Sequence, residues 1–346
     1  MRACVLETAQ SMVIRDIAEP PLKPGHVMVA PRAVGLCGTD LHVYQGTMEH
    51  RVPYPAVLGH EFAGEVVEAA DDVEGFAPGD PVAVDNVIDC GHCPRCAEGQ
   101  RNVCENMNVF GIDSPGALAE RVVVPARLLH PFPRELPIHL GALAELYSIA
   151  VHASRRTRIE TGDAVVLLGA GRVGLCLLDV MRTSGARLIV SVDVDPTRLD
   201  VARQIGADAT LDASACDVVE EVRALTDGRG CDKVVEAVGH PVEVEGQGSP
   251  TWLAFEMIRS AGQITLLGQG EQIDRVYWRE FVLKEATVTT SRLNLGDFPR
   301  AIELLASGRL HPDRIITHRM PLAEAPVAFA RLAAREPGMI KVVVEL

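Results

Sequence analysis

The sequence lacks any apolar run long enough to cross a bilayer. Its longest candidates, such as Ala164–Gly171, have the length of a strand and end in glycine. The first residues contain Arg2 but neither a sustained apolar stretch nor a small-residue cleavage site. We therefore expect no membrane span, no secretory signal and a cytoplasmic location.

An excess of positive charge is also missing. The 33 lysines and arginines are outnumbered by 47 aspartates and glutamates, which gives a net charge of −14. A surface of this sign repels phosphate backbones and anionic lipids. We therefore expect neither a nucleic-acid partner nor a membrane partner.

The length of 346 residues exceeds the common size of one domain and predicts two. The first part alternates Gly and Pro breaks with strand-like stretches, which indicates an irregular β-barrel or sandwich. These predicted strands are His26–Ala33, Gly64–Ala69, Asp80–Val84 and Glu120–Val124.

Beyond Leu136 the pattern changes to helices alternating with short apolar strands. Such alternation predicts an α/β domain with a parallel sheet. The predicted helices are Ile138–Arg156, Arg172–Thr183, Pro196–Ile205, Asp217–Leu225 and Thr251–Ser260. The predicted strands are Ala164–Leu168, Leu188–Val192, Ala209–Leu211, Lys233–Ala237 and Gln263–Leu267. The tail adds helical stretches at Phe298–Ser307 and Pro321–Arg335 and a last strand at Ile340–Glu345.

A glycine-rich motif, Gly169-Ala-Gly171-Arg172-Val173-Gly174, directly follows the first strand of this alternation. The glycines permit a tight turn, admit a pyrophosphate close to the backbone and let helix and strand pack closely. The following helix offers free N–H groups to phosphate. A glycine turn without a nucleotide is the alternative, and the strand–turn–helix context favours dinucleotide binding.

Asp193 stands at the end of the next strand, 19 residues after Gly174. Its carboxylate can accept hydrogen bonds from the adenosine ribose hydroxyls and repels a 2′-phosphate, so we expect NAD. Arg198 nearby leaves NADP as an alternative.

Four of the nine cysteines are crowded into one segment, as Cys90-x2-Cys93-x2-Cys96-x7-Cys104. Without a secretory signal, this crowding favours a metal over disulfides. Four thiolates suit a closed, tetrahedral structural zinc in a lobe of about residues 86–108. An iron–sulfur cluster is the alternative.

A second set of potential metal ligands is dispersed along the chain. Cys37 lies in a polar turn, His60 is followed by Glu61, and Glu145 begins another candidate segment. A catalytic zinc needs about three protein ligands and an open position. Each of these residues taken alone is more often structural.

The motifs together resemble the zinc-containing medium-chain dehydrogenase family. The similarity runs from CGTDLH (37–42) and GHEFAG (59–64) through the four cysteines and GAGRVG (169–174) to IKVVVEL (340–346). It implies a GroES-like barrel at 1–150 and 291–346 and a doubly wound Rossmann domain at 151–290. It also implies two zinc ions, one catalytic and one structural.

For the catalytic zinc, the resemblance implies Cys37 and His60 as ligands. Glu61 is the third ligand or lies beside it in the polyol and threonine branches. Glu145 matches a glutamate that can approach or replace the water on the metal, but a leucine follows it where the family usually has proline. Which glutamate completes the shell therefore stays open at this point.

For the proton and the cofactor, the resemblance implies further roles. Thr39 and His42 match the family's proton path from substrate to solvent. Backbone at Gly239, Leu267 and Gly268 is expected on the nicotinamide side. Ser291 and Arg292 fall where the polyol branch places polar residues, and Arg292 is suited to a phosphate or a carboxylate.

The expected activity is hydride transfer to NAD from a secondary alcohol of a small polyol or sugar-derived molecule. An amino-alcohol 3-dehydrogenase of the threonine type is one alternative. A nucleotide-binding protein without catalysis is the alternative of another class. Relatives are dimers or tetramers, so we expect a homo-oligomer.

Overall fold

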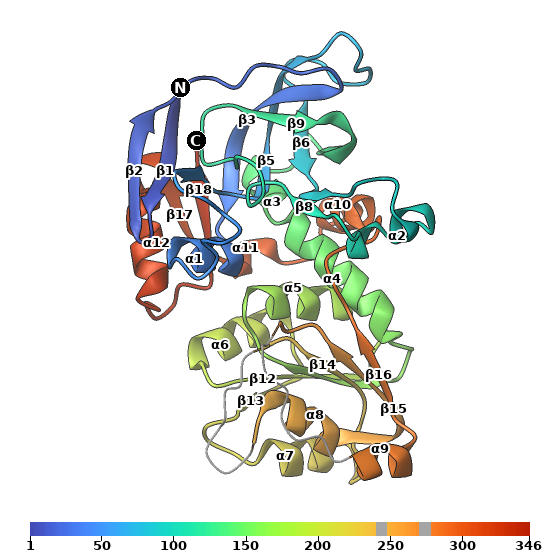
Figure 1. Cartoon of the computed structure of the whole chain (residues 1–346). Helices are drawn as coiled ribbons and strands as arrows, with labels where there is room; N and C mark the ends of the chain where they lie inside the picture. Colours follow the sequence, from blue (N-terminus) through green and yellow to red (C-terminus); the bar gives the residue numbers. More distant parts are fainter. Residues whose placement is uncertain (240–247, 270–277) are drawn as a thin grey trace. The chain divides into compact units, whose positions relative to one another are not determined.

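The structure is a computed structural model that describes residues 1–239, 248–269 and 278–346 (Figure 1). The chain divides into two compact units. Unit 1 comprises Met1–Leu146, Leu295–Gly308 and Ile316–Leu346, and unit 2 comprises Tyr147–Asn294 and Arg309–Ile315. Both units are thus assembled from segments that are distant in the sequence.

Unit 1 is built on β-sheets. Its main sheet has the strand order β10-β6-β5-β3-β18-β17, with β9 paired to β3. These strands are β3 (His26–Gly35), β5 (Glu61–Ala69), β6 (Pro81–Val84), β9 (Val122–Pro125), β10 (Leu129–Pro131), β17 (Ile316–Pro321) and β18 (Lys341–Glu345). Smaller sheets pair β1 (Arg2–Thr8) with β2 (Ser11–Asp16) and β4 (Ala56–Val57), and β7 (Val87–Ile88) with β8 (Asn108–Val109).

Short helices surround these sheets. They are α1 (Gly38–Tyr44), α2 (Pro94–Ala97), α3 (Ile138–Gly141), α10 (Phe298–Ala306) and α12 (Ala325–Ala333), with 3₁₀ turns at Arg101–Val103, Ala126–Leu128 and Leu322–Glu324.

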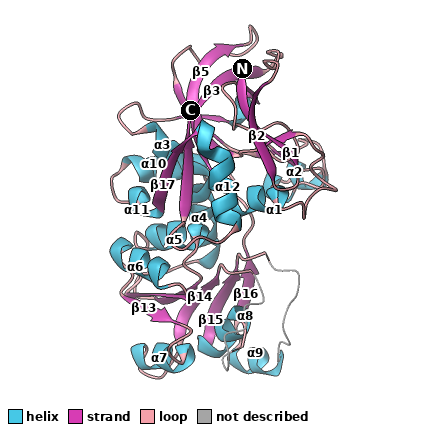
Figure 2. Ribbon diagram, turned by 90° about the vertical axis from the view of Figure 1, so that its left-hand side faces the viewer, coloured by secondary structure: helices cyan, strands magenta, loops and turns pink. Residues whose placement is uncertain are grey.

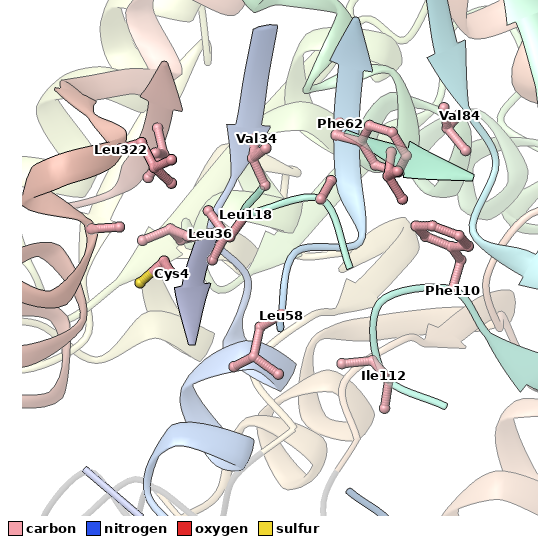
Figure 3. Close-up of a cluster of buried hydrophobic side chains, with 14 of the residues drawn as sticks. Cys4, Val34, Leu36, Leu58, Phe62, Val84, Phe110, Ile112, Leu118 and Leu322 are labelled. Carbon is pink, nitrogen blue, oxygen red and sulfur yellow. The ribbon is translucent and has the colours of Figure 1, made fainter. Parts of the chain in front are cut away.

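The core of unit 1 fixes the ends of β3 and β5. Val34 on β3 and Phe62 on β5 are buried in one cluster, which also takes in Leu36, Leu58 and Phe110 (Figure 3). The rings of Phe62 and Phe110 lie 5.5 Å apart, a favourable aromatic separation. These contacts fix the chain on either side of Cys37 and His60.

Unit 2 is a parallel sheet with the order β13-β12-β11-β14-β15-β16. The strands are β11 (Ala164–Leu168), β12 (Leu188–Asp193), β13 (Ala209–Asp212), β14 (Cys231–Glu236), β15 (Ile258–Leu266) and β16 (Thr287–Thr290). The helices are α4 (Ala144–Thr157), which begins in unit 1, α5 (Arg172–Met181), α6 (Pro196–Ile205), α7 (Val218–Leu225), α8 (Pro250–Met257), α9 (Trp278–Lys284) and α11 (Pro312–Ile315).

The strand order of unit 2 reverses at β11. The chain proceeds outward through β12 and β13, and then returns to pair β14 with the other side of β11. Helices α5 and α6 cover one face of the sheet, and α7, α8 and α9 cover the other (Figures 1 and 2). This is the predicted doubly wound architecture, and the reversal is where such sheets bind ligands.

Several predicted boundaries need correction. The helix predicted at Ile138–Arg156 is interrupted between α3 and α4. Gly141, the last residue of α3, packs so closely on β5 that a side chain there would meet Ala63 at 2.5 Å. The helix predicted at Thr251–Ser260 ends at Met257. Ile258–Ser260, the last residues of the predicted helix, instead begin β15. The pairing of β15 with β14 is irregular near Ala261.

Strands in the C-terminal third were missed. The helical stretch predicted at Pro321–Arg335 starts too early, since Pro321 ends β17 and α12 begins at Ala325. Strands β16 and β17 were not predicted because TVTT and ITHRMP lack an apolar run. Pairing with apolar neighbours, rather than their own composition, makes them strands.

Candidate metal and cofactor sites

The four crowded cysteines converge in unit 1. Their sulfur atoms lie within 4.8 Å of one another. The Sγ atoms of Cys90 and Cys96 are 4.0 Å apart, and those of Cys93 and Cys104 are 3.9 Å apart. Four sulfurs around one zinc at ~2.3 Å lie about 3.8 Å apart in a tetrahedron. The spacing fits a single zinc ion and is too long for disulfides.

Backbone N–H groups in this lobe stabilise negative charge on two of the cysteine sulfurs. N–H groups of His92 and Cys93 donate to the sulfur of Cys90 and lower its pKa to about 6. N–H groups of Glu105 and Cys96 lower the pKa of Cys93. Burial raises the pKa of Cys96 to about 12. Ionising the remaining thiols therefore costs free energy unless a cation binds the four sulfurs. A structural zinc is such a cation.

The dispersed ligands also converge, at the neighbouring ends of two paired strands. Strands β3 and β5 are antiparallel, and their register places Gly35 opposite Glu61. Cys37 follows β3 at the start of α1, and His60 directly precedes β5. One ligand atom from each of Cys37, His60 and Glu61 lies within 4.8 Å of the others. Sulfur, imidazole and carboxylate together form a donor set that suits zinc.

Asp40 holds the imidazole of His60. One carboxylate oxygen of Asp40 lies 3.1 Å from Nδ1 of His60, and the other accepts the backbone N–H of Cys37 at 2.9 Å. Burial acts to raise the pKa of Asp40, but His60 and the Cys37 N–H outweigh it and lower this pKa. Burial opposes charge on His60, yet Asp40 and Cys37 raise its pKa well above the usual value. A metal cation can take the place of that proton.

Glu61 is fully buried, and its two carboxylate oxygens differ. Oε2 accepts a hydrogen bond from Nζ of Lys341, which is also fully buried. Oε1 has no hydrogen-bond partner among the described residues. An orphaned buried carboxylate oxygen beside a thiol and an imidazole fits a metal ligand.

Glu145 lies near this set but outside it. Its carboxylate, in the first turn of α4, accepts a hydrogen bond from Asn86 at 3.0 Å. Burial and the nearby carboxylate of Glu61 raise the pKa of Glu145 to about 7. Among the described residues, the close ligand set contains Glu61 and not Glu145.

Thr39 and His42 both lie on α1. His42 is exposed, and its Nδ1 lies 3.5 Å from the hydroxyl of Thr47. Within the described part of the chain, no hydrogen bond is recorded between Thr39 and His42. The structure therefore places the two residues on one short helix without linking them.

The glycine-rich turn has the geometry that its motif predicts. Gly169 has φ of +95°, and Gly171 caps the N-terminus of α5, which begins with Arg172 and Val173. A side chain at Gly174 would fall 1.9 Å from the carbonyl oxygen of Gly169. Only glycine allows this contact between turn and helix, and the free N–H groups of the first helical turn can receive a phosphate.

Asp193 ends β12 beside this turn. Its carboxylate accepts the N–H of Ala170 at 2.7 Å and those of Val194 and Asp195 at 2.8 and 3.0 Å. Arg198 approaches it, with Nη1 3.6 Å from Oδ1. The carboxylate predicted to read the ribose thus lies against the phosphate-binding turn, and a cation lies next to it.

The remaining predicted cofactor residues follow the next strands. The turn at Gly239 touches the turn at Gly268 so closely that a side chain at Gly268 would meet the nitrogen of Gly239 at 2.2 Å. The N–H of Leu267 donates to the carbonyl oxygen of Glu236 at 2.8 Å. Ser291 is buried just past β16, and Arg292 is exposed.

Three partner residues were missed from the sequence. Asp40 lies three positions after Cys37, where a side chain can cap the start of a helix, and this spacing could have revealed it. Lys341 is a lone charge in a run of valines, which signals a buried partner. Glu236 ends a buried strand, and its carboxylate accepts the N–H groups of Val238 and Gly239 at 2.7 and 2.9 Å.

No helix in the described residues is both long and apolar enough to cross a membrane.

Two family models match the chain. The alcohol dehydrogenase GroES-like domain matches residues 23–134, and the zinc-binding dehydrogenase model matches residues 173–307. The first match contains the four crowded cysteines together with Cys37, His60 and Glu61, and the second begins at Val173, inside the glycine-rich turn.

The curated relatives are dehydrogenases. A 2-dehydro-3-deoxy-L-galactonate 5-dehydrogenase of Pseudoalteromonas atlantica is 35% identical, covering 91% of this chain and 90% of its own. An L-threonine 3-dehydrogenase of Pyrococcus horikoshii is 35% identical, covering 88% and 86%. A sorbitol dehydrogenase of Bacillus subtilis is 28% identical, covering 99% and 97%.

Solved structures share the whole fold. A zinc-binding dehydrogenase of Sinorhizobium meliloti bound to NADP matches with a TM-score of 0.92 and 32% identity, over 100% of this chain and 99% of that one. An alcohol dehydrogenase of Escherichia coli complexed with NADH matches with 0.91 and 28%, over 100% and 99%. The chain therefore belongs to the zinc-containing alcohol dehydrogenase family.

Proposed function

We propose that this dehydrogenase transfers a hydride to NAD from a secondary alcohol of a small polyol or sugar-derived substrate. The convergence of Cys37, His60 and Glu61 carries the proposal. A zinc ion held by these residues supplies a Lewis acid that lowers the pKa of a hydroxyl group. NAD supplies the hydride acceptor.

The chain's own residues orient the ligands and move the proton. Asp40 fixes the ring of His60 so that its other nitrogen faces Cys37. The hydroxyl oxygen of Thr39 accepts the proton of the substrate hydroxyl as the Thr39 hydroxyl releases its own proton toward solvent. The exposed ring of His42 takes up that proton and passes it to water. Glu145, whose pKa is raised, lies close enough to approach the metal. It is not one of the ligands in the resting site.

The other predicted site residues keep their proposed roles. Cys90, Cys93, Cys96 and Cys104 hold the structural zinc. Gly169, Gly171, Arg172, Val173 and Gly174 receive the pyrophosphate, and Asp193 receives the ribose. Gly239, Leu267, Gly268 and Ser291 serve the nicotinamide side. Arg198 and Arg292 are cations for phosphate or carboxylate groups.

Two further parts of the proposal concern organisation and location. Residues 1–150 and 291–346 form the catalytic domain and 151–290 the NAD-binding domain. Compact units that separate after Leu146 and Asn294 support this division, apart from Arg309–Ile315, which belongs to the second unit. None of the nine cysteines forms a disulfide in the described residues, which supports a cytoplasmic location.

The oligomer forms through the open edge of the parallel sheet. Strand β16 is the last strand of the described sheet, and Val288 on it is exposed. On the adjoining helix α9, Val282 is 78% exposed and Leu283 63%. An unpaired strand edge beside exposed apolar side chains favours a symmetric contact with a second copy. A homodimer or homotetramer follows.

An amino alcohol of the threonine type is the second candidate substrate, favoured by the 35% identical threonine dehydrogenase. The sugar-acid and sorbitol dehydrogenases favour the polyol class. Because both classes carry a secondary hydroxyl, the metal site serves either.

An NAD-reduction screen tests the proposal. Polyols, aldonates and threonine are offered with NAD to the zinc-loaded enzyme and to its Cys37→Ser variant, and NADH is followed at 340 nm. We expect one polyhydroxylated class to give NADH and the variant to lose at least about 100-fold in rate, because an electrostatic catalyst of this kind is worth several kcal/mol. Full rate in the variant would sink the catalytic-metal assignment, and exclusive turnover of threonine would select the second candidate.

A further inference from the structure

Lys341 is a buried cation that the proposed chemistry does not use. It is the first residue of β18 and is fully buried. Its Nζ donates to Oε2 of Glu61 and to the carbonyl oxygen of Leu36, the latter at 3.2 Å. The lysine thus donates hydrogen bonds to Glu61, a proposed metal ligand, and to Leu36, the residue before the proposed ligand Cys37.

The glycine at position 35 leaves space for the ion pair of Lys341 and Glu61. A side chain at Gly35 would fall 2.6 Å from Oε2 of Glu61 and 2.7 Å from Nζ of Lys341. The strand pairing that places Gly35 opposite Glu61 therefore requires a residue without a side chain at position 35. A buried ion pair contributes little to stability compared with apolar residues of the same size. Val342, Val343 and Val344 of the same strand are fully buried or nearly so, which shows that apolar side chains pack well here.

The ion pair with Lys341 also makes the two carboxylate oxygens of Glu61 inequivalent. Lys341 occupies Oε2, whereas Oε1 has no hydrogen-bond partner among the described residues. Oε1 is therefore the oxygen without a donor, and it can bind an ion that also binds Cys37 and His60. The cation also withdraws charge from the carboxylate, which weakens its attraction for a metal.

We propose that Lys341 is a positioning residue that keeps Glu61 a one-oxygen, readily exchanged ligand of the catalytic metal. This inference rests on the proposed catalytic site at Cys37, His60 and Glu61. Without the lysine, both oxygens of Glu61 face the metal with a full negative charge. The metal is then held more tightly, and Glu61 gives up its position to substrate less readily.

Lys341→Met tests the inference on the zinc-loaded enzyme. Zinc release to the chromogenic chelator 4-(2-pyridylazo)resorcinol is followed in time, and the four-cysteine site in the same chain is the internal control. We expect release from the catalytic site to slow by about 10–100-fold, the size of effect that groups behind metal ligands have. The four-cysteine phase should not change.

Cobalt gives a second readout that does not depend on activity. With Co²⁺ in the catalytic site, Lys341→Met should weaken the visible d–d bands, because a second oxygen of Glu61 raises the coordination number. Lys341→Arg keeps the charge and should leave both the spectrum and the release rate near wild type. In a Glu61→Gln background, Lys341→Met should have no effect on either readout.

The outcomes separate the two hypotheses. Release from Lys341→Met that is as fast as wild type or faster, or a slowing that persists in the Glu61→Gln background, overturns the role of Lys341. A wild-type chain that binds zinc only at the four cysteines overturns the proposed function before any variant is made. If Lys341→Met fails to fold, Lys341→Leu, which also leaves Oε2 of Glu61 without a donor, must show the same slowing, and wild-type release from it overturns the inference.

Discussion

Asp40 acts on the metal site through another residue. Its carboxylate is fully buried between the ring of His60 and the N–H of Cys37, so it orients one ligand and the backbone of a second. A carboxylate behind a ligating histidine fixes the ring and raises its basicity. The geometry of the site therefore depends on a group outside the close ligand set.

Replacing Asp40 with asparagine should weaken the site without removing a ligand. The amide keeps the shape but loses the charge that supports His60. We expect kcat/KM to fall by about 10–100-fold and zinc affinity to fall with it. Asp71→Asn, at an exposed position outside the site, is the matched control. Unchanged zinc affinity and rate in Asp40→Asn would show that the aspartate only supports the fold.

Asp193 is the residue that we propose to set the choice between NAD and NADP. Asp193→Asn removes the charge that repels a 2′-phosphate and weakens the acceptor for the ribose, while Arg198 stays in place. We expect the preference for NAD over NADP in kcat/KM to fall by about tenfold or more, because a hydrogen bond to a charged group is worth roughly 1.5–3 kcal/mol.

The control for this change is Asp200→Asn, an exposed acid of helix α6 that pairs with Arg203. Steady-state rates with both cofactors measure the preference. A ratio that does not move in Asp193→Asn would mean that another group discriminates between the cofactors.

At the residue scale, roles that depend on contiguous residues can be predicted from the sequence, whereas contacts between residues far apart in the chain cannot. The roles of Gly169 and Gly174 follow from a motif, because strand, turn and helix are contiguous. The ion pair of Lys341 with Glu61 joins residues 280 positions apart. No spacing rule predicts it, since it depends on β18 and β5 both lying beside β3.

Elements were predicted well where their ends carry chemical signals. Helix α6 starts and stops as predicted, with the Asp195 side chain accepting the N–H of Thr197 at its start and Gly206 at φ of +110° at its end. The short, polar strand β16 was missed, because its pairing with β15 defines it. The four-cysteine lobe was predicted, since its spacing alone specifies the ligands.

The four-cysteine lobe should depend on its metal. Four-residue helix α2 and a 3₁₀ turn offer little apolar burial, so zinc binding supplies the folding energy of this segment. In Cys104→Ala we expect one zinc fewer per chain and rapid proteolysis between residues 86 and 108. Cys216→Ala, outside both metal sites, should keep full zinc content. A resistant lobe in Cys104→Ala would show that its packing suffices without the ion.

At the scale of the whole molecule, the sequence correctly predicts the α/β architecture and the family. Motifs in the same order along the chain are enough for that. It does not reveal that Arg309–Ile315 belongs with unit 2, because this segment follows α10 of unit 1 in the chain. A bond between His311 and the buried Asp179 of α5 holds it there, with the His311 N–H 2.6 Å from the carboxylate.

The exposed sheet edge predicts the response of the oligomer to a charge. Leu283→Lys places a cation in the proposed apolar contact beside β16 and should dissociate the oligomer toward monomers in sedimentation velocity. Val327→Lys, at an exposed position of α12 in unit 1, is the matched control and should leave the assembly intact. An unchanged sedimentation coefficient in Leu283→Lys would place the interface elsewhere.

Zinc content per chain tests the central claim most directly, since it requires no knowledge of the substrate. Purified wild type and Cys37→Ser are compared by mass spectrometry of metals after dialysis. The account predicts two zinc ions per wild-type chain and one in the variant, which keeps the ion at the four cysteines. One zinc in both proteins, or two in both, would contradict a catalytic zinc held by Cys37, His60 and Glu61.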